Sequence, residues 1–159
     1  MTSKKRVVLI TGAESGIGKS TSKIFLDNGY KVICTYLKNN NNKNTKDIEY
    51  HRIDITKNKD WENLALYIKK KFKKIDVLVN SAGVRLSGNL ETTSMSDWSY
   101  HLNNNVTGTF LACKYILPFL KKAKNSSIIN VASINSIRGA KNMLAYATSK
   151  SAIISFTAS

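Results

Sequence analysis

The 159-residue sequence predicts an α/β fold, in which a doubly wound parallel sheet carries helices on both faces. Five segments read as strands, and most are continuous apolar runs, which is the pattern of strands buried on both faces. Segments with apolar residues at helical spacing lie between these runs. A Gly-rich turn joins the first strand to the first helix. This alternation predicts a parallel sheet, and the length fits one domain over residues 1–159.

The strands and the first two helices have clear signals in the sequence. The strands are expected over residues 6–11, 31–36, 48–55, 76–83 and 126–133, and the third is the weakest. The first helix is expected to end near Asn28, with Gly29 at the position that terminates many helices. The second helix, 60–72, has one apolar face made of Trp61, Leu64, Ile68 and Phe72.

The later helices are expected after a polar loop. Ser94 and Asp97 form a capping box, and the helix that they open carries apolar residues at helical spacing, namely Leu102, Val106, Phe110, Cys113 and Leu117. Pro118 is expected to bend its last turns. The Asn-rich segment 38–46 lacks apolar residues and reads as a surface loop.

The composition argues against a protein that reads nucleic-acid sequence, although the net charge is +15. Only four of the 25 basic residues are Arg, namely Arg6, Arg52, Arg85 and Arg138. Proteins that read bases rely on the arginine fork. The sequence therefore predicts no specific nucleic-acid partner and a solvated basic surface that attracts anionic ligands.

The cysteines, the histidines and the hydropathy indicate a cytoplasmic protein without a metal site. Cys34 and Cys113 lie in apolar runs without disulfide or metal spacing, so they read as reduced core residues. His51 and His101 have no partners at metal-ligand spacing and are expected to be structural. The first apolar run is too short for a signal peptide, and no run reaches the length of a membrane span.

The Gly-rich turn "TGAESGIGKST" directs backbone N–H groups toward an anion and therefore suits a phosphate group. A dinucleotide-binding turn would use Gly12, Gly16 and Gly18 for the tight turn, the approach of a pyrophosphate and close helix packing. A P-loop would use Lys19 as the phosphate-binding lysine, with Asp54 after a later strand to hold magnesium. The turn by itself leaves both readings open, together with a turn that binds nothing.

A Tyr, a Lys and a Ser form a candidate catalytic group. Tyr146 and Lys150 are four residues apart and therefore lie on one helical face. A lysine ammonium beside a tyrosine favours the phenolate and makes the hydroxyl a usable general acid or base. Ser133 is expected at the end of the fifth strand, where it could meet Tyr146, because strand ends line the ligand crevice of a doubly wound sheet.

Five motifs in this order resemble the short-chain dehydrogenase/reductase family over nearly the whole chain. The turn "TGAESGIG" looks like the family's cofactor turn, and "NSAG" resembles its N-N-A-G element with Ser81 as a departure. Trp98 and Asn105, seven residues apart, are similar to the family's helix with a catalytic Asn. "NVAS" and "YATSK" match its Ser and its Tyr-x-x-x-Lys. The resemblance implies a Rossmann-like sheet with the strand order 3-2-1-4-5.

The resemblance implies an NAD(P)-dependent oxidoreductase that transfers a hydride between a nicotinamide cofactor and an alcohol or carbonyl substrate. Tyr146 would exchange a proton with the substrate oxygen, and Ser133 would hydrogen-bond that oxygen. Lys150 would hold the nicotinamide ribose, and the backbone of Asn105 would anchor a water that leads to Lys150. The implied cofactor-binding residues are Gly12, Ser15, Gly16, Ile17, Gly18, Tyr36, Lys38, Asp54, Ile55, Asn80, Ala82, Gly83, Tyr146 and Lys150.

Three of these assignments have competitors in the sequence. Asn104 competes with Asn105 for the catalytic amide, and Ser136 competes with Ser133 for the hydroxyl. Asp54 would meet the adenine in the family's arrangement, but it could simply cap a turn.

The end of the second strand favours NADP(H) over NAD(H). NAD-selective folds place an acid there, which binds the ribose 2′-OH and repels a 2′-phosphate. Here the aligned residue is Tyr36, and Lys38 follows with a free ammonium. One position argues against this preference. Many NADP-preferring relatives carry a basic residue just before the second Gly of the turn, whereas this chain has Ser15 there.

Family members continue beyond the Tyr-x-x-x-Lys helix through two more strands and a segment that closes over the substrate. The resemblance therefore implies that this sheet is incomplete on its C-terminal side, as a fragment or a natural truncation. We expect an exposed edge on the fifth strand, self-association, and no dehydrogenase activity of residues 1–159 alone. The full-length form is expected to be a homo-oligomer. Two alternatives remain, a P-loop-type nucleotide phosphotransferase and a catalytically dead dinucleotide-binding fragment.

Overall fold

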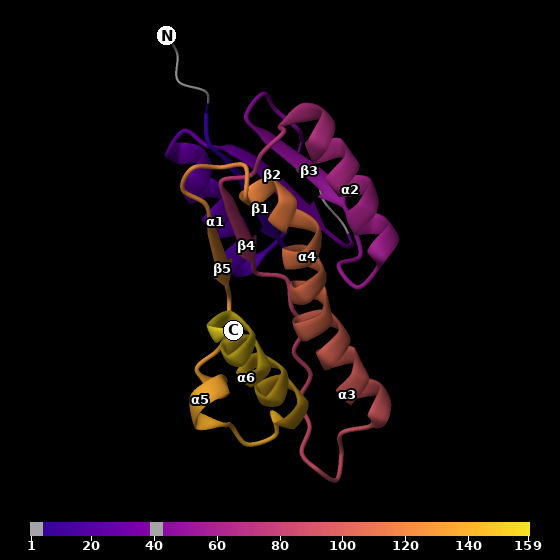
Figure 1. Cartoon of the computed structure of the whole chain (residues 1–159). Coiled ribbons are helices and arrows are strands. Elements are labelled where there is room, and N and C mark those ends of the chain that lie inside the picture. The colour runs from indigo at the N-terminus through magenta and orange to yellow at the C-terminus, as the bar shows by residue number, and fades with distance from the viewer. Residues whose placement is uncertain (1–4, 39–42) are drawn as a thin grey trace.

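A computed structural model describes residues 5–38 and 43–159 of the chain. Its strands form one parallel sheet in the order β3-β2-β1-β4-β5, which confirms the predicted order (Figure 1). In the centre of the sheet, Leu9 of β1 lies opposite Ile33 of β2 and Leu78 of β4. The strands are β1 (Val7–Thr11), β2 (Lys31–Tyr36), β3 (Ile48–Arg52), β4 (Val77–Asn80) and β5 (Ser127–Asn130).

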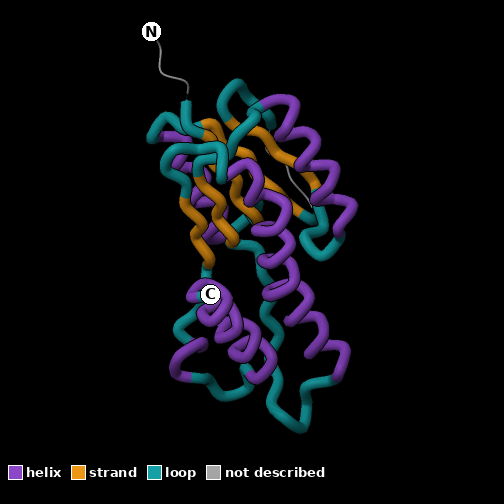
Figure 2. Tube along the Cα trace, viewed as in Figure 1, coloured by secondary structure: helices purple, strands orange, loops and turns teal. Residues whose placement is uncertain are grey.

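Helices cover both faces of the sheet, and three of them extend beyond the carboxyl ends of the strands. Figure 2 shows the strands between the helices, with α3, α5 and α6 below the sheet. The helices are α1 (Gly16–Asp27), α2 (Asn58–Lys71), α3 (Met95–His101), the π-helical η1 (Leu102–Thr107), α4 (Gly108–Leu120), α5 (Asn135–Arg138) and α6 (Leu144–Ala158). The short α5 has no signal in the sequence. We find no helix among the described residues with the length and hydropathy that a membrane crossing requires.

Alternate residues of each central strand enter two separate cores. Val8 and Ile10 of β1 lie in the core that α1 covers, whereas Val7 and Leu9 lie in the core that α2 and α4 cover. Because both faces are buried, the central strands contain continuous apolar runs, at 7–10, 32–34 and 77–79. The predicted apolar face of the second helix is buried in full, at Trp61, Leu64, Ile68 and Phe72.

Three strands are shorter than the sequence predicts. β3, β4 and β5 stop at Arg52, Asn80 and Asn130, each three residues before its predicted end. After β4, the next two N–H groups donate to the hydroxyl of Thr11 at 3.1 Å and so leave the strand ladder. Ser133 consequently lies in the turn between β5 and α5, and the prediction that it ends the strand is wrong.

The helix predicted after Ser94 consists of three parts, α3, η1 and α4. Ser94 begins it as predicted, because its Oγ accepts a hydrogen bond from the N–H of Asp97 at 3.0 Å. The π-helical turn η1 then changes the register in which side chains leave the helix. α4 includes Pro118 and continues to Leu120.

The apolar stripe predicted on this helix is not its buried face. Phe110 and Leu117 remain 47% and 42% exposed, whereas α4 buries Leu111 and Ile116 against α2 and the sheet. The register change at η1 and the apolar character of α4 on all sides explain the error, because a helix that is apolar all round does not indicate which face is buried. Cys113, predicted as a core residue, is only partly buried, while Cys34 is fully buried as predicted.

The edges of the sheet agree with the sequence. β5 is an edge strand, and Ile128 and Ile129 are 39% and 46% exposed, as expected of an apolar edge. Residues 43–46 of the Asn-rich segment are exposed, and residues 39–42 of that prediction lie outside the described residues.

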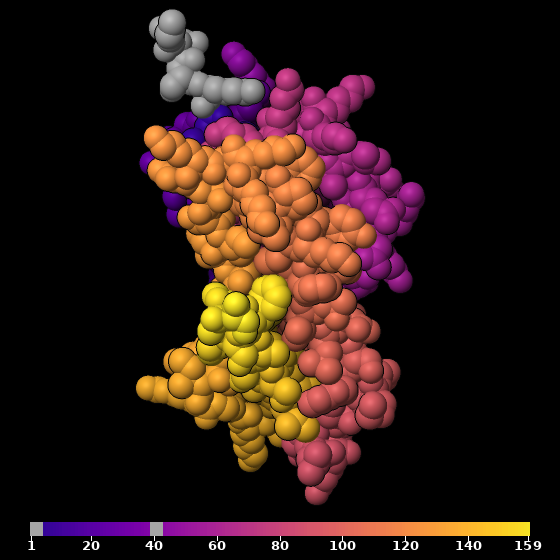
Figure 3. Space-filling model, viewed as in Figure 1, coloured from indigo at the N-terminus to yellow at the C-terminus, as the bar shows by residue number. Residues whose placement is uncertain are grey.

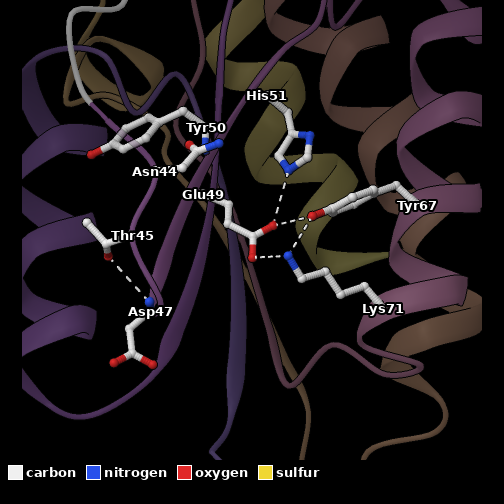
Figure 4. A network of polar contacts seen from close by, with 8 residues as sticks. All are labelled: Asn44, Thr45, Asp47, Glu49, Tyr50, His51, Tyr67 and Lys71. Atoms are coloured by element: carbon white, nitrogen blue, oxygen red, sulfur yellow. Dashed lines mark hydrogen bonds and ion pairs between the residues drawn. The ribbon is translucent and has the colours of Figure 1, made fainter.

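A polar network joins the other edge strand, β3, to α2 (Figure 4). The carboxylate of Glu49 accepts a hydrogen bond from the hydroxyl of Tyr67 and pairs with Lys71 at 2.6 Å, and His51 Nε2 lies 3.7 Å away. Burial would raise the pKa of Glu49, but the hydrogen bonds from Lys71 and Tyr67 outweigh it and place that pKa below its ordinary value. Burial also lowers the pKa of His51.

We predict that Glu49→Gln lowers the free energy of unfolding at pH 7 by about 1–3 kcal/mol, because the neutral amide keeps one acceptor oxygen for the two donors, Tyr67 and Lys71, and places an NH2 donor beside them. A lowered folded-state pKa means that the stabilisation is present above the unfolded glutamate pKa of about 4.3 and is lost as the pH falls through the folded value. Urea titrations should therefore show a lower free energy of unfolding for Glu49→Gln than for wild type at pH 7, and this difference should become smaller in acid. Glu62→Gln is the control, since Glu62 is exposed and pairs with Lys59 at 3.4 Å. Equal effects of the two substitutions would contradict the prediction.

Candidate active site

A cleft of about 910 Å³ lies at the carboxyl ends of β1, β2 and β4. The Gly-rich turn forms one wall, and the residues that follow β2 and β4 form the two flanks. Tyr100 of α3, Asn104 of η1 and Tyr146 of α6 close the far end. In the space-filling view, α6 lies against the segment that contains α3 and η1 (Figure 3). The cleft therefore brings together residues from both halves of the chain.

The three glycines of the turn meet three different requirements. Gly12 has φ +65°, and a Cβ there would lie 2.7 Å from the Cα of Ala82. A Cβ at Gly18 would overlap the carbonyl oxygen of Gly12, so α1 packs directly on the turn. Gly16 has no neighbour within 4 Å of an added Cβ and is open to solvent. A dinucleotide-binding turn needs these three properties: a tight turn at Gly12, close helix packing at Gly18, and open space at Gly16 for the approach of the pyrophosphate.

The residues that a P-loop would need are not brought together. Lys19 is exposed on the first turn of α1 and does not line the cleft. Asp54 does not line it either, because its Oδ1 accepts from the N–H and the hydroxyl of Thr56 at 2.9 and 2.7 Å. Asp54 therefore caps a turn, and its neighbours Ile53 and Ile55 reach the cleft instead.

Tyr146 lines the cleft, and Lys150 lies one turn further along α6, behind it. The lysine is 6% exposed, and its Nζ donates to the backbone carbonyl of Val131 at 2.7 Å. Burial lowers the pKa of Lys150. A Cβ at Gly83 would lie 3.4 Å from this Nζ and 3.0 Å from Asn105 Oδ1, so both polar groups stand directly beside the segment after β4.

Asn105 is buried in the π-helical turn, and its side chain ties two segments together. Its amide exchanges two hydrogen bonds with the backbone of Val84, at 2.7 and 3.0 Å, and donates to Ser149 Oγ at 2.8 Å. Its backbone carbonyl accepts from the hydroxyl of Thr109 at 2.8 Å. Asn104, the competing residue, instead lines the cleft. In the π-turn, the side chain of Asn105 thus points into the interior while its neighbour Asn104 faces the cleft.

Ser133 does not line the cleft. Its Oγ accepts from the N–H of Asn135, and its own N–H donates to Ser136 Oγ, both at 3.2 Å.

The predicted cofactor residues divide into two groups. Those that line the cleft are Gly12, Ser15, Gly16, Ile17, Tyr36, Lys38, Ile55, Ala82, Gly83 and Tyr146. Those that do not line it are Gly18, Asp54, Asn80 and Lys150.

Three residues that shape the site were not selected from the sequence. Thr11 holds the segment after β4 through two N–H groups. Ser149 is fully buried and holds Asn105. Each stands next to a selected residue, Thr11 before Gly12 and Ser149 before Lys150, which is the only signal of its role. The third is His101, the last residue of α3, which is buried with its ring centroid 6.5 Å from that of Tyr146.

Two charged residues of the cleft were also missed. Glu14 lies in the turn, and its Oε1 accepts from the N–H of Leu37, after β2, at 3.5 Å. Its carboxylate therefore stands at the same end of the cleft as Lys38. Arg85 lines the cleft after β4. It is the first charged residue after that strand, a signal that the sequence carries.

The sheet order, the glycine turn and the cleft at the strand ends define a Rossmann-like protein with room for a nucleotide. Residues 6–159 match the short chain dehydrogenase family, and the chain belongs to that family.

The chain is similar to a 3-oxoacyl-(acyl-carrier-protein) reductase of Thermotoga maritima, with 32% identity over 96% of this chain and 65% of the relative. Ligand-free aldohexose dehydrogenase of Thermoplasma acidophilum superposes with a TM-score of 0.90 at 32% identity, over 97% of this chain and 59% of that one. ElxO with NADP bound superposes with a TM-score of 0.85 at 32% identity, over 96% of this chain and 65% of that one. The chain thus spans less than two thirds of the length of each of these proteins.

Proposed function

We propose that this chain binds a nicotinamide dinucleotide and serves an oxidoreductase that interconverts an alcohol and a carbonyl group. The observation that carries the proposal is that one cleft is lined both by the glycine turn and by Tyr146. The turn at 12–17 would hold the pyrophosphate, and the segment 81–83 would flank the adjacent ribose. The bound cofactor would supply or accept the hydride.

The chain's own residues would control one proton and the orientation of the substrate. The hydroxyl of Tyr146 would exchange a proton with the substrate oxygen, and the ammonium of Lys150 would favour its phenolate. Asn105 would keep α6 in place through Ser149. For Ser133 to donate a hydrogen bond to the same oxygen, the bound substrate would have to extend beyond the present lining of the cleft. The Oγ of Ser133 accepts from Asn135 and keeps its proton free.

We also propose a cytoplasmic location and a homo-oligomeric full-length form. Burial raises the pKa of the Cys34 thiol to about 12, so this cysteine stays protonated and unreactive. An unreactive free thiol fits a reducing compartment. The homo-oligomer rests on the family resemblance alone.

Titration with a reduced nicotinamide cofactor, followed by its fluorescence, tests the proposal against the phosphotransferase alternative. We expect saturable binding that magnesium-ATP does not displace at equal concentration. Magnesium-dependent ATP binding without nicotinamide binding would instead support the phosphotransferase. Cofactor binding by the intact protein without any turnover of alcohols or carbonyls would support a purely binding role.

We propose that the cofactor is NADP(H), with Lys38 as the main determinant. Lys38→Asp should weaken NADP(H) binding by about 1–3 kcal/mol, the scale of a charge-assisted contact, and leave NAD(H) binding nearly unchanged. Glu14 opposes this preference, because its carboxylate stands at the same end of the cleft and would repel a 2′-phosphate. Glu14→Gln should therefore tighten NADP(H) binding selectively. Tighter binding of NAD(H) than NADP(H) by the wild-type protein would refute the assignment.

A further inference from the structure

The segment that follows β4 is fixed at alternate residues. The N–H and the carbonyl of Val84 both bond to the amide of Asn105. Four residues later, the N–H of Gly88 donates to the carbonyl of Asn142 at 2.8 Å, and its carbonyl accepts from the N–H of Leu144 at 3.0 Å. The backbone from 84 to 88 is therefore held between η1 on one side and the start of α6 on the other.

His101 supplies the anchor between these two points. Its Nε2 accepts from the N–H of Leu86 at 2.9 Å, and its Nδ1 lies 2.7 Å from the carbonyl of Asp97. A carbonyl can only accept and an N–H can only donate, so the ring is the neutral tautomer with its proton on Nδ1. The imidazole is 1% exposed. A buried ring with both nitrogens bonded holds Leu86 in one place.

Arg85 lies between two of these anchored residues, Val84 and Leu86, and lines the cleft. It lines the cleft together with Tyr100, Asn104 and Tyr146, and it is exposed. Within residues 5–38 and 43–159, no hydrogen bond or ion pair engages its guanidinium. A cation on a fixed backbone without a protein partner is available to a ligand.

The charges of the cleft are separated along its length. Three charged side chains line it, and Glu14 and Lys38 lie together where β2 ends. Arg85 follows β4, on the opposite side of β1, in the segment 84–88 whose Gly88 bonds to Leu144 at the start of α6, the helix that carries Tyr146. Of the three charged side chains, Arg85 is thus the one in the segment bonded to the helix of Tyr146, whereas Lys38 lies where β2 ends.

We propose that Arg85 determines specificity by binding a carboxylate on the substrate of the proposed reaction. The inference rests on the function proposed above and adds the class of substrate, a carbonyl or alcohol compound that carries a carboxylate. A guanidinium presents paired N–H donors that match the two oxygens of a carboxylate. A single cation at this end suits a monoanion. The net charge of +15 would also draw anions toward the cleft.

The test compares two ketones that differ only in charge, 4-oxocyclohexanecarboxylate and its primary amide, on the intact protein with its cofactor. In wild type, the carboxylate should have the lower KM. Arg85→Gln should raise the KM for the carboxylate at least about tenfold, the scale of one lost charge-assisted hydrogen bond, and leave the amide unaffected. Arg85→Lys should be intermediate, because a lysine keeps the charge without the fork. The cofactor Kd should not change in either variant.

Equal shifts of KM for both ketones, or a weaker cofactor Kd in Arg85→Gln, would overturn the inference. A binding measurement separates it from the proposed function, namely saturation-transfer NMR of each ketone in the presence of oxidised cofactor. Arginine-dependent binding of the carboxylate without turnover would support the inference and contradict the oxidoreductase function. Turnover that is insensitive to Arg85→Gln would support the oxidoreductase function and contradict the inference about Arg85. A wild-type protein without preference for the carboxylate in either measurement would also overturn it.

His101 variants test whether Arg85 acts from a fixed position. The side-chain oxygen of Gln can replace Nε2 as the acceptor for Leu86, whereas Asn reaches only as far as Nδ1. His101→Gln should keep the KM for the carboxylate near wild type, and His101→Asn should raise it, with no change in cofactor Kd. Amide exchange at Leu86 should be faster only in His101→Asn. Equal KM values in the two variants would show that His101 does not position Arg85.

Discussion

Replacement of Tyr146 by Phe is expected to lower kcat of the intact protein by about 10²- to 10⁴-fold, the usual contribution of a positioned proton donor. The change removes one hydroxyl from the wall of the cleft and leaves the ring in place. The cofactor Kd should therefore stay nearly unchanged, because the glycine turn that would hold the pyrophosphate is untouched. Steady-state kinetics and a cofactor titration on the same preparation measure the two quantities.

Tyr100→Phe provides the matched control. Tyr100 also lines the cleft and loses the same hydroxyl, but it belongs to α3 and has no lysine four residues along its helix. Its kcat should remain close to that of wild type. A Tyr146→Phe protein that kept more than about a tenth of wild-type kcat would fall outside the range for a general acid or base and refute the role.

Gly18→Ala is expected to abolish measurable cofactor binding and to lower the free energy of unfolding by about 1–3 kcal/mol, the scale of overpacking in a tight interior. The new Cβ would overlap the carbonyl oxygen of Gly12 and lie 2.8 Å from its carbonyl carbon. Both are backbone atoms, so relief requires α1 to move away from the turn. The movement would displace the N–H groups that would meet the pyrophosphate. Urea unfolding and cofactor titration measure the two effects.

Gly29→Ala separates local strain from damage to the turn. Gly29 follows α1 at its other end, has φ +79° and has no neighbour within 4 Å of an added Cβ. An alanine there should cost about 1–2 kcal/mol for a left-handed backbone and leave the cofactor Kd unchanged. If Gly18→Ala bound the cofactor as tightly as Gly29→Ala, the close packing at Gly18 would have no part in the site.

The parts of the site that follow each other closely in the chain could be predicted from the sequence. The glycine turn and the Tyr146–Lys150 pair were located from their spacing, because helical and turn geometry fix what lies within a few residues, and the family resemblance implied their roles. Ser133 was wrongly placed at the end of the strand, because the apolar residue Val131 extends the strand pattern past Asn130, where β5 ends. Lys19 and Asp54 were left open as P-loop residues, since their directions depend on how α1 and the turn after β3 are oriented.

Contacts between distant segments were decided only by the tertiary structure. Asn105 holds Val84 and Ser149, and His101 holds Leu86, across separations of 15 to 44 residues. No sequence period reports such bonds, because each needs two elements to pack at one distance and orientation. The π-turn that aims Asn105 inward is likewise invisible in the residue pattern.

The sequence by itself determined the alternation of strands and helices, the strand order through its family motifs, and the identity of the turn and the helix that bear the candidate chemistry. Local geometry and apolar periodicity can be read from short stretches of the sequence, because they depend on residues that are close together in the chain. The tertiary structure alone decided which face of α4 is buried, which predicted residues reach the cleft, and that Arg85 lines the same cleft as Tyr146. Those properties depend on packing between elements, where a shift of one residue in register redirects every side chain.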